Sequence, residues 1–236
     1  MIENSKNQSF VANRVNIDTM WIFKVRSDAE PSTNVEEAIS LVGNIFISFD
    51  DFIFPTSTEY VLWVPQSGLS ENVPATGEIE SSNGITADEL ITELRRQTGD
   101  GIGTFRRLTI DGNLTRIFLE DGEHLIDSTS NRYQQWARDG ILEQPPAEDI
   151  FRIDVFYSDS SGEKYGSYQI VVRTYTDIWF EETEIGERNR ERLAVALDRL
   201  FDTIDADSVQ FESRIISDHD LNQSSFSILY PGRESE

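Results

Sequence analysis

The sequence contains no cysteine, only two histidines and only three lysines, and each shortage excludes a class of chemistry. Without cysteine the chain forms no disulfide, supplies no thiolate and has no zinc site that needs sulfur ligands. No stretch approaches the roughly 20 apolar residues of a membrane-spanning helix. The first ten residues lack the basic and apolar regions of a signal peptide. We therefore expect no membrane partner.

Negative charge, in contrast, is abundant: the formal net charge is -23. Every basic residue except Lys6, Lys24 and Lys164 is an arginine, and the acidic residues are spread along the whole chain. In molar salt the Debye length is about 3 Å, so dense carboxylates no longer repel at range and keep a surface hydrated. This pattern predicts a protein of an extreme halophile, in a salt-rich cytoplasm or in a virion. The alternative is an ordinary acidic soluble protein.

Residues 186–204 have the clearest helical pattern. Apolar residues recur there at spacings of three and four, which places them along one side of a helix. They are Leu193, Ala196, Leu197, Leu200, Phe201 and Ile204. Because the flanking segments have the composition of strands, we expect this helix to pack across a sheet and to organise the C-terminal half.

The most specific local signal is a capping box formed by Thr86 and Glu89. At this spacing the threonine and glutamate side chains bond each other's backbone amides at the start of a helix. Ile85 and Leu90 flank the box in the positions of a hydrophobic staple. We expect the helix that begins there to end at about residue 99.

A second box, Thr33 with Glu36, predicts a short helix that ends at about residue 42. The next segment, residues 44–54, is rich in β-branched and aromatic residues, so we expect a strand. It is joined around Pro55 to another strand at residues 59–64, and residues 67–74 have the composition of a loop.

The remaining expected strands alternate apolar and polar residues or are rich in β-branched ones. Asp111-Gly112-Asn113 and Asp121-Gly122 have the composition of turns between strands. A short helix is expected at residues 130–138. The strands are expected at residues 19–25, 104–110, 114–119, 123–127, 150–157, 165–176, 208–216 and 225–230.

Residues 143–149, EQPPAED, have the composition of an extended linker, because two prolines stand in an acidic stretch. We therefore expect an α+β protein of two mainly antiparallel sheet units, each with helices packed on one face. The N-terminal domain would span residues 1–142. The C-terminal domain, residues 150–236, would have the order β-β-α-β-β.

No catalytic motif is present, so we predict no enzyme, no catalytic residue and no cofactor. The rival hypothesis is an accessory enzyme that holds a divalent metal with carboxylates, and its candidate ligands are Asp50, Asp51, Asp218 and His219. An acidic pair alone and a histidine in an acidic turn are weak signals. Nucleic-acid affinity falls steeply with salt, which argues against a nucleic-acid partner.

Protein contacts are the better expectation. Arg190 and Arg199 lie off the apolar side of the predicted helix, so they are available to pair with acidic residues of a neighbouring subunit. Trp179 and Phe180 precede an acidic pair and are candidates for an interface. We therefore predict a homo-oligomer or part of a larger assembly.

Three stretches carry a resemblance to a known family. They are YGSYQIVVRTYTD, ERNRERLAVALDRLF and VQFESRIISDHDLNQSSFSILY, a hairpin strand, a helix and a closing strand pair. Their order over residues 151–230 resembles that of the tail-terminator proteins of long-tailed viruses. The resemblance implies a small α+β sandwich that assembles into a hexameric ring, and it transfers no functional residue.

The leading hypothesis is a non-enzymatic structural or assembly protein from an extreme halophile, such as a virion tail, neck or baseplate component. The alternatives are the metal-dependent accessory enzyme and a regulatory module that binds a small molecule or a protein.

Overall fold

A computed structural model describes residues 17–30, 34–65, 72–81, 84–98, 103–119, 122–125, 151–159, 166–174 and 184–215. These residues form one seven-stranded antiparallel sheet, a two-stranded hairpin and three helices. The large sheet consists of β1 (Ile17–Arg26), β2 (Ile53–Pro65), β3 (Asn72–Glu80), β4 (Thr104–Leu114), β7 (Phe151–Ser158), β8 (Ser167–Thr174) and β9 (Ser208–Ile215). The helices are α1 (Val35–Phe49), α2 (Ala87–Thr98) and α4 (Glu184–Thr203). The hairpin pairs β5 (Arg116–Leu119) with β6 (Gly122–Leu125).

The strands of the large sheet follow the order β3-β2-β4-β7-β8-β1-β9. This confirms the α+β class, but the expected division into two sheet units is wrong. Strand β1 lies between β8 and β9, and β4 pairs with β7, so strands from both ends of the chain share one sheet. The expected linker, residues 143–149, lies outside the described residues, as do the helix expected at 130–138 and the strand expected at 225–230.

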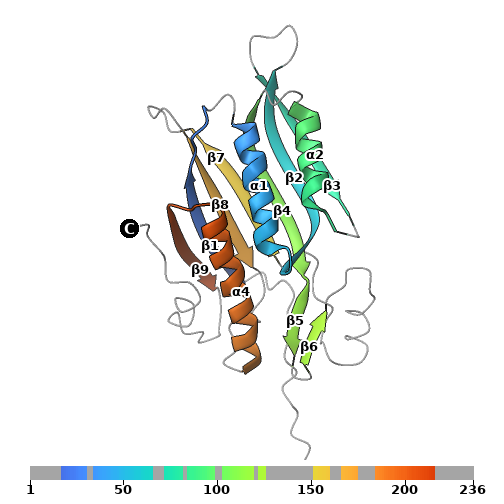
Figure 1. Cartoon of the computed structure of the whole chain (residues 1–236), viewed down its shortest axis with the longest axis vertical. Helices are drawn as coiled ribbons and strands as arrows, with labels where there is room; N and C mark the ends of the chain where they lie inside the picture. Colours follow the sequence, from blue (N-terminus) through green and yellow to red (C-terminus); the bar gives the residue numbers. More distant parts are fainter. Residues whose placement is uncertain are drawn as a thin grey trace, which may run out of the picture.

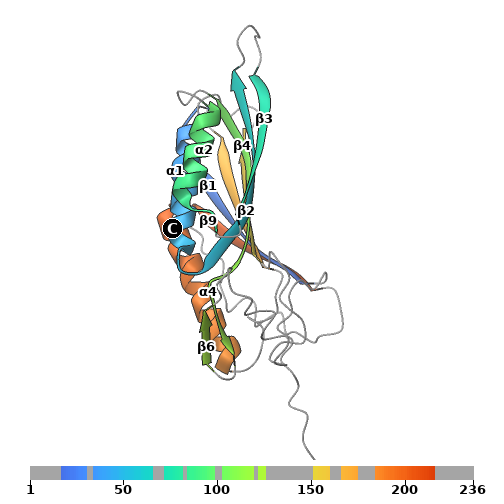
Figure 2. The same cartoon turned by 90° about the vertical axis from the view of Figure 1, so that its right-hand side faces the viewer.

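All three helices lie on one side of the sheet, as Figures 1 and 2 show. Helix α1 is the central one and contacts both α2 and α4. The main core fills the space between this helix layer and the sheet, where residues such as Trp21, Phe23 and Val42 are inaccessible to solvent. In the described part of the chain, no helix combines the length and apolar character needed to cross a membrane.

Two parts of the sheet are built alike. Strands β3 and β4 both pair with β2 in antiparallel fashion, so they run parallel to each other and α2 connects them. Strands β8 and β9 likewise flank β1, and α4 connects them. We call these the α2 unit (β2, β3, α2 and β4) and the α4 unit (β1, β8, α4 and β9). Helix α1 leads from β1 in one unit to β2 in the other.

Helix α4 confirms the predicted helix at residues 186–204. Its apolar side faces the core: Leu193, Leu197 and Leu200 are fully buried, and Ala196 and Ile204 are nearly so. Phe201 is half-buried and packs against the same core. The stripe could be predicted from the sequence because its residues recur at helical spacing over the whole helix.

Helix α1 is longer than predicted and begins differently. It runs to Phe49, so the expected strand at residues 44–54 is wrong over most of its length. Val42, Ile45 and Phe49 continue the helical spacing and are buried, and this burial overrides the strand propensity of the segment. The helix follows Asn34, which makes no side-chain cap bond, and Thr33 of the expected capping box lies outside the described residues.

Strand β3 was not predicted, because the segment contains Pro74, Ala75 and Gly77. It is an edge strand that pairs only with β2, and an edge tolerates a proline without a backbone donor. A Cβ atom at Gly77 would overlap the ring and hydroxyl of Tyr60, which crosses this position. The strand therefore depends on its neighbour rather than on its own propensity.

The first expected Asp-Gly turn is wrong, whereas the hairpin expected around the second is confirmed. Strand β4 continues through Asp111-Gly112-Asn113, where a Cβ atom at Gly112 would lie 2.6 Å from the Phe54 carbonyl oxygen. Glycine serves there for a close approach of two backbones. After Asp121, Gly122 pairs with Leu119 in the expected hairpin.

Candidate functional site

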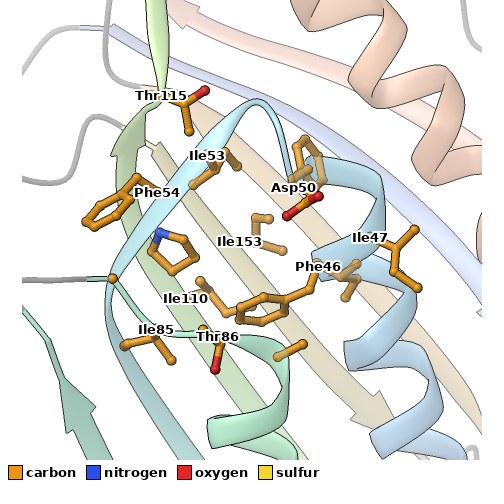
Figure 3. A pocket seen from close by; sticks show the side chains of 15 residues that line it. Phe46, Ile47, Asp50, Ile53, Phe54, Ile85, Thr86, Ile110, Thr115 and Ile153 are labelled. Atoms are coloured by element: carbon orange, nitrogen blue, oxygen red, sulfur yellow. The ribbon is translucent and has the colours of Figure 1, made fainter. Parts of the chain in front are cut away.

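A pocket of about 440 Å³ opens beside the last turn of α1 (Figure 3). It lies between α1, the start of α2 and the beginning of β2, and its floor is the sheet. The lining is mostly apolar. It consists of Ile45, Phe46, Ile47, Phe49, Asp50, Ile53, Phe54, Pro55, Gly84, Ile85, Thr86, Ala87, Ile110, Thr115 and Ile153.

The floor is rigid and apolar. Ile53, Ile110 and Ile153 come from β2, β4 and β7, and each is at most 6% exposed. They lie together because alternate residues of neighbouring antiparallel strands face the helix layer. The floor therefore offers branched aliphatic surface to any group that enters.

The wall formed by α2 is fixed by the predicted capping box. The Glu89 carboxylate accepts hydrogen bonds from the Thr86 amide at 2.8 Å and from the Thr86 hydroxyl at 2.9 Å. The Glu89 amide donates in return to Thr86 Oγ1 at 3.3 Å. The Thr86 bonds hold the pKa of Glu89 below its usual value. The Ile85 amide donates to the Pro55 carbonyl at 2.9 Å, which ties the start of α2 to β2.

The two aspartates that follow α1 have different environments. Asp50 is exposed and lines the pocket. Among the described residues, no hydrogen bond or ion pair reaches its carboxylate. Asp51 lines a groove on the α4 side, where its carboxylate accepts a hydrogen bond from Arg199 Nη1 at 3.1 Å. Asp50 and Asp51 therefore line two different depressions, the pocket beside α2 and the groove beside α4.

That groove has a volume of about 260 Å³ and contains one of the predicted interface residues, Arg199. Arg199 also lies 3.5 Å from the Ser48 carbonyl oxygen, and Arg192 donates to the Asp51 carbonyl at 3.2 Å. Helix α1 has no basic residue in its last turn, so α4 supplies the positive charges that its end lacks. The exposed Val195 lines the same groove.

The other predicted site residues are not brought together in the described structure. Arg190 is half-buried on α4. Trp179, Phe180, Asp218 and His219 lie outside the described residues. Within the described ranges, no group of three or more histidine, aspartate or glutamate side chains is arranged to hold a metal ion. Asp50 and Asp51 alone do not make the predicted metal site.

A buried charge cluster on the other face of the sheet was not predicted either. Asp154 is only 4% exposed, and its carboxylate accepts a hydrogen bond from the Thr109 hydroxyl at 2.7 Å. Arg107 and Arg173 lie 3.4 and 3.7 Å from the same carboxylate. These contacts join β4, β7 and β8, so the cluster has a structural role.

The pocket was not predicted from the sequence, because residues 44–49, which form its wall on α1, were expected to be a strand. The spacing of Val42, Ile45, Phe46 and Phe49 was the available signal for a longer helix. No protein-family model matches the chain, and no curated protein matches it. Similarity to known proteins therefore does not identify the site.

Proposed function

We propose that this protein is a non-enzymatic assembly protein and that it contacts other protein molecules through the helix layer around the end of α1. One observation supports this above all. Ile47 on α1 is 61% exposed and Val195 on α4 is 57% exposed, and they are the most exposed large apolar side chains in the described part of the chain. Surface apolar groups beside depressions are typical of protein interfaces.

The charge distribution supports the same surface. Residues 38–49 of α1 carry no charged side chain, although the chain has a net charge of -23. Two copies of such an acidic molecule repel least where their surfaces are neutral or of mixed sign. On α4 the arginines are interleaved with Glu187, Glu191 and Asp198, which allows the acids of one copy to face the arginines of another.

The partner we propose is therefore a second copy of this chain. Arg190 and Arg199 would lie at this contact, as the sequence predicts. A closed ring like that of the tail-terminator proteins is one such assembly, and a virion in a hypersaline environment is the setting that the composition favours. Both remain proposals.

Light scattering in molar KCl tests the proposal. We expect the parent to have a mass of at least twice the 26.9 kDa of one chain. Ile47→Glu and Val195→Glu should each shift the mass to that of a single chain, because each places a charge in an apolar contact. Ser40→Glu is the matched control, since Ser40 is exposed on the same helix and should leave the mass unchanged. A parent of 26.9 kDa at high protein concentration would overturn the proposal.

Arg190→Ala and Arg199→Ala test the contribution of α4. Because the Arg199 ion pair is exposed, its loss should reduce the stability of one chain by less than about 1 kcal/mol. Variants that melt like the parent but dissociate would support the proposed contact. Variants that keep the parent mass would remove these arginines from it.

A further inference from the structure

We infer that the pocket between α1 and α2 binds a small organic cation, with its apolar body on the isoleucine floor and its positive charge beside Asp50. The floor of this pocket and Asp50 lie on the α2 side of α1, whereas the groove with Val195 and Arg199 lies on the α4 side. Ile47 belongs both to the pocket lining and to the proposed contact, but the inference uses Asp50 and the isoleucine floor and does not depend on self-assembly.

The size and lining of the pocket define the body of the ligand. A volume of about 440 Å³ falls within the range of roughly 300–1,000 Å³ that is usual for ligand pockets. Ile53, Ile110 and Ile153 form the floor, and Phe46 and Phe54 stand at the sides (Figure 3). A phenyl or short alkyl group fits this lining, because it removes apolar surface from water on both partners.

Asp50 defines the charged group of the ligand. Among the described residues it is the only charged one in the lining, and no basic side chain of this part of the chain pairs with it. Its neighbour Asp51 has such a partner in Arg199. The difference leaves one carboxylate of the pair available to a group that comes from outside the chain.

The ends of the two helices favour the same sign of charge. Asp50 follows the C-terminal end of α1, where the helix dipole is negative, and Arg192 and Arg199 reach this end from the α4 side without lining the pocket. The start of α2 would attract an anion, but it already carries the Glu89 carboxylate, which accepts from the Thr86 amide and hydroxyl, while the Glu89 amide donates to Thr86 Oγ1. The potential at the pocket is therefore negative, and an anionic ligand is disfavoured.

Three small molecules with one phenylethyl body test the inference: 2-phenylethylammonium, 2-phenylethanol and 3-phenylpropionate. Binding is followed by NMR of isoleucine methyl groups, at the lowest KCl concentration at which the parent keeps its melting transition. The signals of Ile53, Ile110 and Ile153 should shift, whereas Ile22, which lies outside the main core cluster and does not line the pocket, should not. We expect the ammonium compound to bind most tightly and the carboxylate most weakly.

Substitutions then isolate the role of Asp50. Asp50→Asn should weaken binding of 2-phenylethylammonium by roughly two- to five-fold, the range expected for an exposed ion pair, and leave 2-phenylethanol unchanged. Asp88→Asn is the control, because Asp88 is exposed on α2 outside the pocket lining. Equal affinity for the three molecules, or an Asp50→Asn variant that keeps the preference for the ammonium group, would overturn the inference. Loss of the preference without a change in oligomer mass would show that the two proposals are separate.

Discussion

The α2 unit and the α4 unit have the same connection of strand, helix and strand, but their helices are held by different interactions. Helix α2 spans 12 residues and buries only Leu90, Leu94 and Thr98. Helix α4 spans 20 residues and buries a continuous apolar stripe. The shorter helix gains less free energy from burial of apolar side chains. Hydrogen bonds of its polar side chains therefore contribute a larger share of its stability.

Glu93 is the centre of those polar contacts. Its carboxylate accepts hydrogen bonds from the Tyr60 hydroxyl at 2.7 Å, from Arg96 Nη2 at 2.6 Å and from Gln97 at 2.8 Å. The Tyr60 bond joins α2 to the sheet. The buried stripe of α4 is apolar, so we expect the stability of α4 to respond to loss of side-chain volume and that of α2 to respond to pH.

The largest expected effect is in the α4 unit. Leu197→Ala removes a fully buried side chain in the middle of the stripe and should lower the free energy of unfolding by about 2–5 kcal/mol, through lost transfer energy and a cavity. Thermal melting in molar KCl measures it. Asp202→Ala on the exposed side of the same helix should stay within about 0.5 kcal/mol of the parent. Similar melting temperatures for both variants would mean that the stripe is not packed as described.

The second effect concerns the joint between the two units. Asn34 is fully buried, and its side-chain oxygen accepts a hydrogen bond from the Phe105 amide of β4 at 2.8 Å. Its carbonyl accepts one from the Tyr168 hydroxyl of β8 at 3.1 Å. Asn34→Ala leaves the Phe105 amide buried without its partner, so we expect a loss of about 1–3 kcal/mol.

Urea unfolding of Asn34→Ala, compared with Ser40→Ala, checks this prediction. Ser40 is exposed on the same helix and bonds only to the Glu36 carbonyl, so its removal should have little effect. If both variants unfold at the same urea concentration, the bond to Phe105 is not a joint between the units.

The same comparison explains what the sequence could predict. Helix α4 and the start of α2 were recognised because their signals are local: a stripe at helical spacing, and Thr86 with Glu89 three positions later. Strands β1, β7, β8 and β9 were recognised from their composition for the same reason. Their pairing was not, because the place of β1 between β8 and β9 depends on contacts between distant segments.

The pocket depends on such distant contacts as well. Its walls come from α1, α2 and three strands, and the decisive segment, residues 44–49, has the composition of a strand. The role of Asn34 was also hidden, since its partner Phe105 is 71 residues away in the sequence. Sequence patterns therefore located the elements with local signals and missed the residues that join them.

The third prediction uses the pH dependence of the α2 contacts. The hydrogen bonds from Arg96 and Gln97 lower the pKa of Glu93 from 4.5 to about 2. A lowered pKa stabilises the folded state above the unfolded value and loses this effect as the pH falls from 4.5 towards 2. Unfolding followed over this range should show a steeper loss in the parent than in Glu93→Gln.

Tyr60 gives the complementary test in base. Burial, with the hydrogen bond to Glu93, raises the pKa of Tyr60 from 10.0 to about 12. A raised pKa contributes stability below the unfolded value and loses it as the pH rises from 10 towards 12. Tyr60→Phe should flatten this loss and cost about 0.5–1.5 kcal/mol at neutral pH. An unchanged profile in base would show that folding does not raise the pKa of Tyr60.

The smallest effect compares the two edge strands. On β3, Glu78 lies opposite Glu59, and repulsion chiefly from Glu80, and also from Glu59, raises the pKa of the exposed Glu78. On β9, at the other edge, Glu212 lies opposite Met20. Like charges directly opposite each other destabilise a strand pair, and salt reduces that repulsion as the Debye length falls from about 10 Å at 0.1 M to about 3 Å at 1 M. Glu78→Gln should therefore raise the melting temperature at low salt and have less effect in molar KCl, whereas Glu212→Gln should have a weaker salt dependence. If the two variants respond to salt alike, the salt dependence of the stability of this acidic chain comes from its overall charge and not from pairs of facing carboxylates.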